Sequence, residues 1–256
     1  MAKHRKQFFE REDQEKAVRI NKYLSDAGIC SRREADRHIE AGDVEIDGKV
    51  AVPGSKVLPQ QKVTFLGKEI KPETRLILLA FYKPKGIVCT TAKDEPDNII
   101  DYIHYESRIY PIGRLDKDSE GLILLTNHGM VMDKILKSSY EHEKEYLVSV
   151  NKPLTAQFLK KMSEGVPILD TITKPCHVEE VDKTTFRIIL TQGLNRQIRR
   201  MCETLDYRVT QLKRIRIMNI HLGRLKPGTY RNLTDWELEE LKLELTQNLD
   251  PHNKNF

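Results

Sequence analysis

The sequence places one aspartate as a candidate catalytic group. Asp116 lies in the stretch GRLDKDSEGLILLTN, residues 113–127. The apolar run from Leu122 to Leu125 predicts a buried strand, so the turn before it is anchored to a core. A carboxylate on a fixed turn can be aimed at a ligand, and Arg114 beside it can hold a phosphate. Asp116, Asp118 and Ser119 also fit ordinary turn or cap residues, and this stretch alone leaves both interpretations open.

Two further segments suggest which chemistry the aspartate could serve. Tyr146 lies in the charged segment KEYLVSV, and the segment GLNRQIRR, residues 193–200, concentrates arginines. A lone carboxylate makes a poor glycoside hydrolase, which usually needs two. It can attack a sugar or a base covalently when the leaving group is recaptured. An arginine would keep the carboxylate ionised, and an aromatic ring would stack on a flipped nucleobase.

The chain lacks the motifs of several common function classes. It has no Walker loop, GxGxxG, HExxH or nucleophile elbow, so we predict no cofactor, no nucleotide and no metal. Its four cysteines are widely separated, which is typical of a protein in a reducing cytoplasm. No apolar run approaches the length of a membrane span, and the N-terminal segment lacks the apolar core of a signal peptide. We therefore expect a cytoplasmic protein that does not bind a membrane, and a monomer by default.

Charge is unevenly distributed along the chain. Residues 187–231 carry eleven arginines and lysines against two acids, a local net charge of +9, whereas the residues from Asn232 onward sum to −4. Such segregation favours a face that binds a polyanion. A solvated charged surface is the alternative for any charge run.

The pattern of apolar residues predicts an α+β protein of two domains with short tails. Residues 1–16 are densely charged and are expected to be disordered. A small domain with its linker is expected over 17–74, a larger one over 75–246, and a C-terminal tail over 247–256. In the small domain we predict a helix that Gly28 ends, a helix opened by a Ser31–Glu34 capping box, and a hairpin at Asp47–Gly48.

The larger domain is predicted to combine helices with a mixed, largely antiparallel sheet. Strands are expected at LILLAFYKP, at the run after Asp116, at KEYLVSV and at TFRIILTQG. Helices are expected over residues 130–137, over 154–162, and after Asn195, which is predicted to cap the helix that follows. A last helix should open with a capping box of Thr234 and Glu237.

The first domain resembles a known RNA-binding module. RINKYLSDAGICSRREADRHIEAGDVEIDGK is similar to the alpha-L module, the fold named after the fourth small-subunit ribosomal protein. The SRREAD core and the VEIDGK hairpin carry the resemblance. Exposed helical positions hold Lys22, Arg32, Arg33 and Arg37, and the last two lie one turn apart, which suits successive phosphates. An unrelated helical mini-domain is the alternative.

The second domain resembles the pseudouridine synthases of the RsuA family. GRLDKDSEGLILLTN, KEYLV and GLNRQIRRM carry the likeness, FYKPKGIVCTT matches the family's first motif, and the similarity covers nearly all of residues 18–245. Within this family, the motif segments are most similar to those of the branch that acts on large-subunit ribosomal RNA. The resemblance implies a catalytic domain over 75–246 that isomerises a uridine to pseudouridine, with ribosomal RNA as its partner.

Residue roles follow from the resemblance. Asp116 would be the catalytic aspartate, Tyr146 would stack on the flipped uracil, and Arg199 would pair with Asp116. Arg114 would help to hold the RNA in its flipped geometry. The remaining candidates are Leu212, which would line the base pocket, Asn195, and Arg196 and Arg200, which would reach backbone phosphates. Core packing is the alternative for Tyr146 and Leu212.

Other functions remain open from the sequence. The same reaction could act on small-subunit ribosomal RNA or on a transfer RNA. A non-catalytic RNA-binding or ribosome-assembly protein could keep the fold, although Asp116, Tyr146 and Arg199 are all present together. A translational regulator that binds through the first domain alone is a further alternative. The sequence does not indicate which uridine is modified or whether naked RNA or an assembly particle is the substrate.

Overall fold

The computed structural model describes residues 17–72, 75–92, 94–136 and 141–247 of the 256-residue chain. The predicted disordered segment at 1–16 and the tail beyond residue 247 lie outside these residues. The chain divides into two units. The N-terminal unit comprises residues up to 77 together with Glu106–Arg108 and Asn127–Val131, and the C-terminal unit holds the rest. The domain boundaries expected from the sequence stay predictions.

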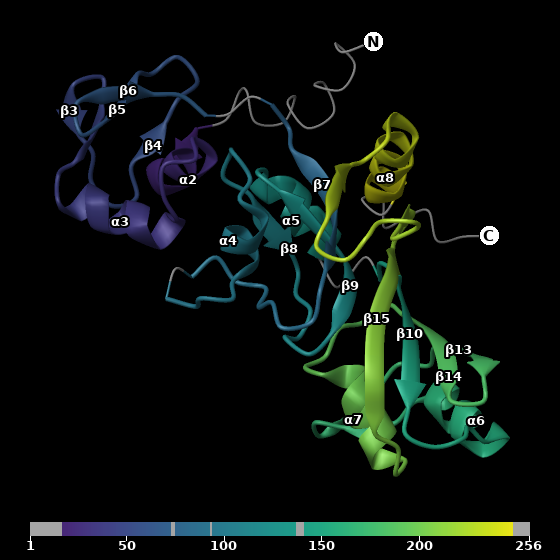
Figure 1. The fold of residues 1–256 in the computed structure, drawn as a ribbon. Helices are drawn as coiled ribbons and strands as arrows, with labels where there is room; N and C mark the ends of the chain where they lie inside the picture. Colours follow the sequence, from purple (N-terminus) through teal and green to yellow (C-terminus); the bar gives the residue numbers. More distant parts are fainter. Residues whose placement is uncertain (1–16, 73–74, 93, 137–140, 248–256) are drawn as a thin grey trace. The chain divides into compact units, whose positions relative to one another are not determined.

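The N-terminal unit contains two helices and short strands, coloured purple to blue in Figure 1. Its elements are β1 (Val18–Arg19), α2 (Ile20–Asp26), α3 (Arg32–Glu40), β2 (Val44–Ile46), β3 (Lys49–Val50), β4 (Lys56–Val57), β5 (Val63–Phe65) and β6 (Lys68–Ile70). The strands pair in the order β3-β2-β5-β6, and β1 pairs with β4. Ile20, Leu24, Ala35 and Ile39 of the helices form the core with Val44 and Val63 of the sheet.

Local signals in the sequence explain these elements. The Ser31 hydroxyl accepts a hydrogen bond from the Glu34 N–H (3.2 Å) and the Glu34 carboxylate accepts one from the Ser31 N–H (2.8 Å), which confirms the predicted capping box. Gly28 follows the end of α2 with a φ of 75°. Asp47 and Gly48 have φ values of 50° and 74°, as a tight hairpin turn requires.

The described part of the C-terminal unit contains one large sheet of nine strands and a separate sheet of two strands. Its elements are β7 (Leu78–Lys83), α4 (Ile99–Ile103), β8 (Tyr110–Ile112), β9 (Glu120–Thr126), α5 (Gly129–Leu136), β10 (Lys144–Val150), α6 (Ala156–Glu164), β11 (Pro167–Ile168), β12 (Thr171–Ile172), β13 (His177–Asp182), β14 (Thr185–Leu190), α7 (Gln197–Thr204), β15 (Val209–Ile217), β16 (Ile220–His221), β17 (Tyr230–Asn232) and α8 (Asp235–Gln247). The first residues of α5 cluster with the N-terminal unit.

The large sheet is mixed and largely antiparallel, as predicted. Its strand order is β13-β14-β10-β15-β9-β7-β17, with β16 beside β15 and β8 beside β9. The pair β15–β9 is parallel, and the other described pairs of this sheet are antiparallel. β7 and β9 are buried along most of their length, as their unbroken apolar runs predict.

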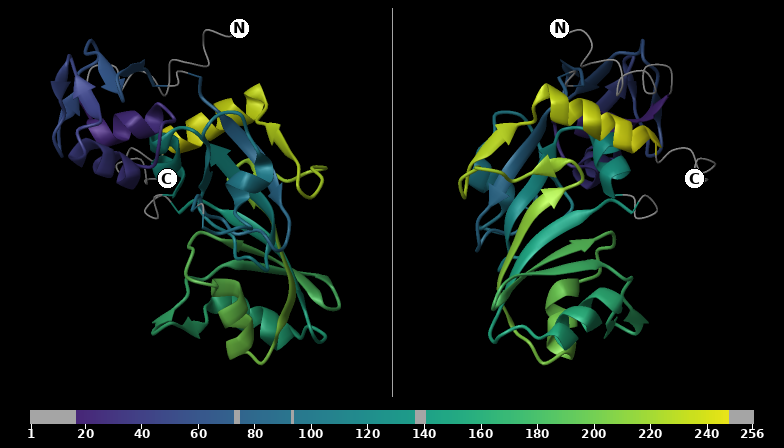
Figure 2. Two further views of the ribbon diagram at one scale, coloured as in Figure 1. Left: turned by 60° about the vertical axis from the view of Figure 1, so that its left-hand side comes forward. Right: turned by 90° about the vertical axis from the view of Figure 1, so that its right-hand side faces the viewer.

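Helices α6 and α7 lie beside the half of the sheet that contains β10, β14 and β15 (Figures 1 and 2). Phe158 and Met162 of α6 and Met201 of α7 pack against Val148 and Phe186 of the strands. α6 begins at Ala156, two residues later than predicted, because the Thr155 hydroxyl accepts the Phe158 N–H (3.1 Å) and so caps the helix there. The predicted Thr234–Glu237 capping box opens α8.

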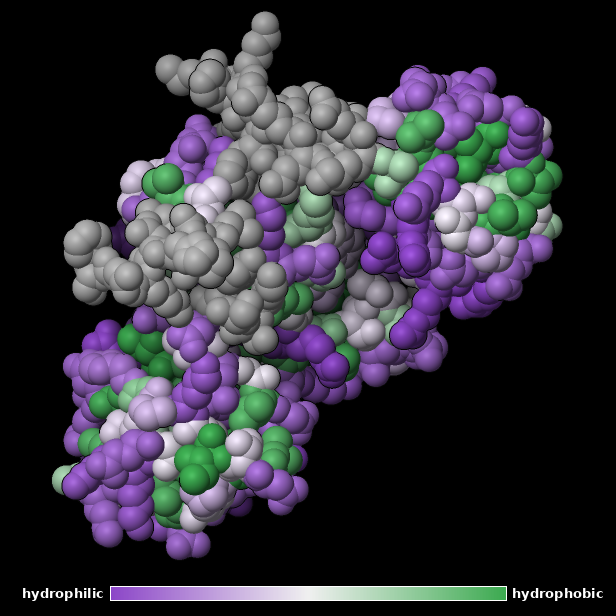
Figure 3. All heavy atoms as spheres, turned by 180° about the vertical axis from the view of Figure 1, so that it is seen from behind, coloured by the Kyte–Doolittle hydropathy of each residue, from purple (hydrophilic) through white to green (hydrophobic). Residues whose placement is uncertain are grey.

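Three of the eleven basic residues in the run at 187–231 form structural ion pairs. Arg216 contacts Glu143 and Glu145 at 2.9 and 2.7 Å, and Arg231 contacts Glu237 at 2.7 Å. Arg187 pairs with Glu179. These glutamates lie outside the basic run, so the run contributes less free charge than its composition indicates. Figure 3 shows one face of the molecule, on whose coloured part hydrophilic residues predominate and hydrophobic residues lie in small groups. No helix among the described residues is long and apolar enough to cross a membrane.

Candidate active site

Asp116 lies in the turn between β8 and β9, which is held by backbone hydrogen bonds. The Ser119 N–H donates to the Asp116 carbonyl (3.0 Å), and the Gly86 N–H donates to the Lys117 carbonyl (2.8 Å). β9 begins directly after this turn and is buried from Gly121 onward. The Asp116 side chain is 33% exposed, so the carboxylate is anchored through its backbone and still open to a ligand.

A buried lysine contacts the backbone of this turn through a hydrogen bond. Lys83, at the end of β7, is 0% exposed, and its Nζ donates to the Pro84 carbonyl (2.8 Å) and to the Lys117 carbonyl (3.5 Å). Burial lowers the pKa of Lys83, while the nearby charges of Cys89, Asp118 and Asp116 act in the opposite direction. Lys83 is not among the residues predicted from the sequence to belong to the site. A lysine at the end of an otherwise apolar strand, LLAFYK, was the available signal.

Two arginines on α7 or at its start contact the turn. Arg196 Nη1 lies 3.5 Å from Asp116 Oδ2 and 3.4 Å from Asp118 Oδ1. Arg199 Nε lies 3.9 Å from Asp116 Oδ2, and its Nη2 lies 3.2 Å from Asp118 Oδ2. Arg199 Nη2 also donates to the Ser119 hydroxyl (3.1 Å). Two carboxylates and two guanidinium groups therefore form one cluster. Its members include Asp118 and Ser119, which the sequence predicts only as turn residues.

The two arginines differ in exposure. The Arg199 side chain is 9% exposed, and that of Arg196 is 40% exposed. Arg199 Nε is buried and has no hydrogen-bond partner among the described residues. A small approach of the Asp116 carboxylate would satisfy this donor, and leaving a buried donor unsatisfied is costly. Arg199 is thus the fixed cation of the cluster and Arg196 the accessible one.

The start of α7 differs from the prediction for Asn195. The N-cap position is Arg196, in the left-handed conformation (φ 48°, ψ 35°), and it has no side-chain capping bond. The Leu194 N–H is satisfied by Gln197 Oε1 (3.1 Å). Asn195 instead accepts two hydrogen bonds from Arg200, one to its carbonyl (3.1 Å) and one to its Oδ1 (3.2 Å). The predicted cap is therefore wrong, and Asn195 orients Arg200.

Tyr146 and Leu212 lie on neighbouring strands of the sheet. Tyr146 on β10 is opposite Arg214 on β15, and Val148 is opposite Leu212. Tyr146 is half-buried and packs at the border of the core, whereas Leu212 is 6% exposed and belongs to that core. Tyr146 can thus present a ring face to a ligand. The packing of Leu212 accords with the alternative that it is a core residue.

Comparison with known proteins identifies the family. The model described as RNA pseudouridylate synthase matches residues 77–204, and the one described as S4 domain matches residues 18–63. The chain belongs to the RNA pseudouridylate synthase family. It is a pseudouridine synthase whose S4 domain precedes its catalytic domain. The family predicted from the motifs is thereby confirmed.

The synthase has close relatives of known name. It is 54% identical to the dual-specificity RNA pseudouridine synthase RluF of Escherichia coli (strain K12) over 88% of this chain and 78% of that protein. It is 32% identical to the ribosomal large subunit pseudouridine synthase B of Bacillus subtilis (strain 168), over 93% of this chain and 98% of that protein. A crystal structure of a pseudouridylate synthase superposes with a TM-score of 0.65 at 27% identity, covering 88% of this chain and 99% of that one.

The cations predicted on the synthase's S4 domain lie on two helices. Arg32, Arg33 and Arg37 of α3 are exposed. Lys22 of α2 is half-buried, and its Nζ forms an ion pair with Asp26 Oδ2 at 2.7 Å. The α3 arginines are therefore more available to a phosphate, whereas Lys22 would have to break its ion pair with Asp26 to bind one.

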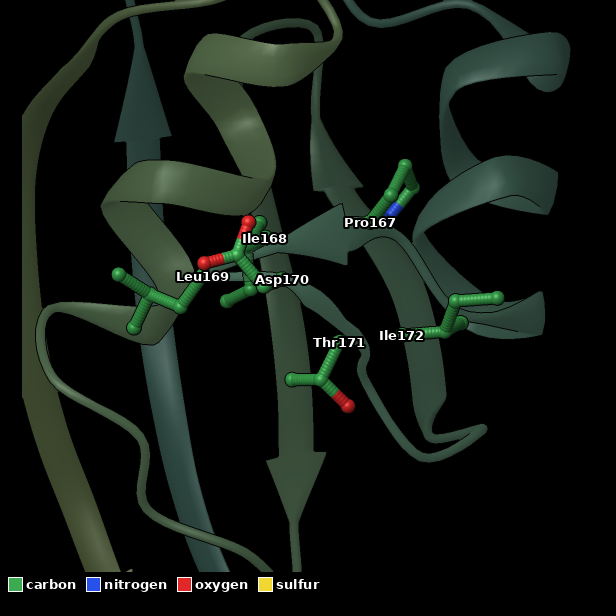
Figure 4. Close-up of a pocket in the computed structure, with 6 residues that line it drawn as sticks. All are labelled: Pro167, Ile168, Leu169, Asp170, Thr171 and Ile172. Carbon is green, nitrogen blue, oxygen red and sulfur yellow. The ribbon is translucent and has the colours of Figure 1, made fainter.

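One open pocket of the synthase contains none of the candidate residues. It measures about 420 Å³ and is lined by the hairpin from Pro167 to Ile172 (Figure 4). Asp170 is the one titratable residue among its lining residues. The described residues contain no group of three or more His, Cys, Asp or Glu side chains that could hold a metal ion. The cluster around Asp116 is therefore the site that we assign to the chemistry.

Proposed function

We propose that this synthase converts a specific uridine of large-subunit (23S) ribosomal RNA to pseudouridine, with Asp116 as its catalytic carboxylate. The observation that carries the proposal is the cluster in which Arg199 and Arg196 meet the Asp116 turn at 3.9 and 3.5 Å. The names of the two relatives support the class of RNA, because one acts on RNA with dual specificity and the other on the large ribosomal subunit.

The reaction balances without a cofactor. The N1–C1′ bond of the uridine breaks, a C5–C1′ bond forms, C5 loses a proton and N1 gains one. The uridine as a whole is neither oxidised nor reduced, because the product is its isomer. Asp116 attacks the sugar or the base, and the uracil turns within the site before it is recaptured. Arg199 orients the Asp116 carboxylate and supplies a positive charge beside it, because its guanidinium is fixed to Ser119 and Asp118.

The remaining candidates would bind the flipped nucleotide. Tyr146 stacks on the uracil, and such stacking contributes about 1–3 kcal/mol per base. Arg114, which is exposed, occupies the space that the base leaves in the RNA. Leu212 closes the base pocket from the core side. Arg196 and Arg200 neutralise backbone phosphates, and Asn195 orients Arg200.

The S4 domain supplies a second RNA contact. Arg33 and Arg37 lie one turn apart on α3 and are exposed, which suits adjacent phosphates.

The proposed partner is RNA, and the proposed location is the cytoplasm. We also propose that the protein is a monomer, in which one copy of the chain contains a complete site. Light scattering of the purified chain tests the monomer, because a dimer would double the 29.8 kDa mass.

The decisive experiment is pseudouridine mapping of ribosomal and transfer RNA from a strain that lacks this protein. The strain is rescued with wild type, Asp116→Asn or Asp118→Asn. We expect one large-subunit site to be lost, to be restored by wild type and to stay unmodified with Asp116→Asn. Asp118→Asn is the matched control, since it removes a charge from the same turn and should retain measurable product. Product formed by Asp116→Asn would refute the role of Asp116.

A second RNA substrate is the alternative that the comparisons favour, because the E. coli relative is named for dual specificity. The same mapping distinguishes the cases. Loss of sites in both ribosomal and transfer RNA would show two substrates, and loss in small-subunit or transfer RNA alone would move the proposal to that RNA. If no site is lost in any of these RNAs, the proposed substrate is refuted.

A further inference from the structure

The candidate site is divided between two halves of the sheet. One half contains β9 and β7, and the turn with Asp116 leads into β9. The other half contains β10, β14 and β13, and Tyr146 lies on β10. The halves meet where β9 runs parallel to β15, and two residue pairs join these strands, Lys213 with Glu120 and Arg214 with Gly121. Figure 1 shows β9 and β15 side by side at this place. The separation of Asp116 from Tyr146 therefore depends on a short ladder.

Arg214 crosses this junction with its side chain. Its residue is 3% exposed, its Nε donates to the Leu122 carbonyl on β9 (2.7 Å), and its Nη1 donates to the Arg114 carbonyl (3.5 Å). Arg114 and Leu122 lie on either side of Asp116 in the chain. One guanidinium thus holds both ends of the segment that presents the carboxylate.

The backbone of Arg214 links the same segment to Tyr146. Arg214 pairs with Tyr146 on one side of β15 and with Gly121 on the other. A Cβ atom on Gly121 would stand 2.2 Å from the Arg214 carbonyl oxygen, so the strands approach closely because residue 121 is glycine. Arg214 thus contacts the segment of Asp116 through its side chain and the strand of Tyr146 through its backbone. It can therefore fix the distance between Asp116 and Tyr146.

The chemistry of Arg214 is unusual for a purely structural residue. No ion pair with a carboxylate is found for it among the described residues, and its Nη2 is buried without a hydrogen-bond partner there. Burying a cation is costly unless it is paired. Arg216, two residues along β15, has the ordinary arrangement, with Glu145 and Glu143 as partners at 2.7 and 2.9 Å on or next to β10.

We propose that Arg214 is a positioning residue of the synthase, which holds the Asp116 turn at the working distance from Tyr146 by spanning the β9–β15 junction. The inference rests on the proposed roles of Asp116 and Tyr146. A guanidinium is suited to this task because its nitrogens form a rigid fork that reaches two carbonyls, whereas a lysine ammonium is a point donor on a flexible stem.

The test compares Arg214→Met, Arg214→Lys and Arg216→Met with wild type and Asp116→Asn. The substrate is ribosomal RNA from the strain that lacks the protein. Single-turnover assays over a range of enzyme concentrations give the rate constant at saturation and the half-saturating concentration, and thermal unfolding gives stability. We expect Arg214→Met to lower the saturated rate at least about 100-fold with less than threefold change in half-saturation. Arg214→Lys should retain part of the rate, because it can still donate to Leu122.

Arg216→Met is the matched control, because it removes a half-buried arginine from the same strand without touching the Asp116 turn. It should lose stability and keep its saturated rate within about threefold. A rate near that of wild type for Arg214→Met would overturn the proposal, as would equal rate losses in Arg214→Met and Arg216→Met. If Arg214→Met does not fold, the saturated rate of Arg214→Lys decides, and a wild-type rate there refutes the positioning role. If Asp116→Asn is active, the proposed function itself fails, whatever Arg214 does.

Discussion

Gly121 and Arg214 approach so closely that a single methyl group would separate them. A Cβ atom at Gly121 would lie 2.2 Å from the Arg214 carbonyl oxygen and 2.7 Å from its nitrogen. Both contacts are to backbone, which cannot rotate away as a side chain can. Gly121 also has a φ of 110°, which L side chains rarely adopt. The sheet is therefore continuous at this point because residue 121 has no side chain.

Gly121→Ala should destabilise the synthase by about 2–4 kcal/mol, because the two strands must separate or the backbone must strain. Gly193→Ala is the control, since nothing lies within 4 Å of its Cβ position, and its effect should stay within about 0.5 kcal/mol. Urea unfolding of both variants measures the difference. Equal stabilities of the two variants would contradict the close approach.

The two arginines near Asp116 should have separable effects. Arg199→Gln removes the fixed cation and its bond to Ser119, so the saturated rate should fall at least about 100-fold. Arg196→Gln should mainly weaken RNA binding and lower its salt dependence by about 0.7–0.9 in the log–log slope, the value for one phosphate contact. Single-turnover rates and binding at several salt concentrations test this. If Arg196→Gln lowers the saturated rate and Arg199→Gln mainly weakens RNA binding, the two roles must be exchanged.

Tyr146→Ala should lower the activity measured as kcat/KM by about 5- to 150-fold, which corresponds to the 1–3 kcal/mol of one stacked base. The control is Tyr230→Ala, because Tyr230 is 43% exposed and packs edge-on against Tyr105, outside the Asp116 cluster. An unchanged kcat/KM in Tyr146→Ala would assign Tyr146 to core packing alone.

The S4 domain should contribute to affinity rather than to the chemical step. A double variant, Arg33→Glu with Arg37→Glu, should raise the half-saturating concentration about tenfold or more and reduce the salt slope, while the saturated rate stays near that of wild type. Lys68→Glu on β6 changes an exposed charge of the same unit and serves as the control. A salt slope that the double variant leaves unchanged would remove α3 from the RNA-binding surface.

Lys83 should make stability depend on pH in the alkaline range. Burial lowers its pKa in the folded state below the unfolded value of 10.5, so between these two values the unfolded chain binds a proton that the folded chain does not. The free energy of unfolding contributed by Lys83 must therefore rise with pH across that window, by at most about 1.4 kcal/mol per pH unit. Relative to Lys83→Met, wild type should gain stability as pH rises toward 10.5.

Urea unfolding of wild type, Lys83→Met and Lys85→Met from pH 7 to 10.5 measures this effect. Lys85 is exposed and two residues away, so its replacement should leave the pH dependence of stability as in wild type. A difference between wild type and Lys83→Met that stays constant or falls with pH would show that Lys83 does not have a lowered pKa.

Several local elements and the family can be predicted from the sequence alone. The Ser31–Glu34 and Thr234–Glu237 capping boxes, the Asp47–Gly48 turn and the buried strand after Asp116 were all predicted, because each depends on residues a few positions apart. The motif resemblance also placed Asp116 and Arg199 in one site, and the structure brings them to 3.9 Å. The Asn195 cap failed although it is local, because the start of α7 is set by Gln197 and by a left-handed Arg196.

Features that depend on residues far apart in the chain become visible only in the folded protein. The sequence predicts Asp118 and Ser119 only as turn residues. In the structure both accept hydrogen bonds from Arg199 of α7, which lies about eighty positions later in the chain. The sequence predicts Arg187, Arg216 and Arg231 as part of one basic face. In the structure each forms an ion pair with a glutamate from outside the basic run. The junction of Gly121 with Arg214 has no local signature, because a parallel strand pair between residues 93 positions apart is fixed by packing and not by nearby residues.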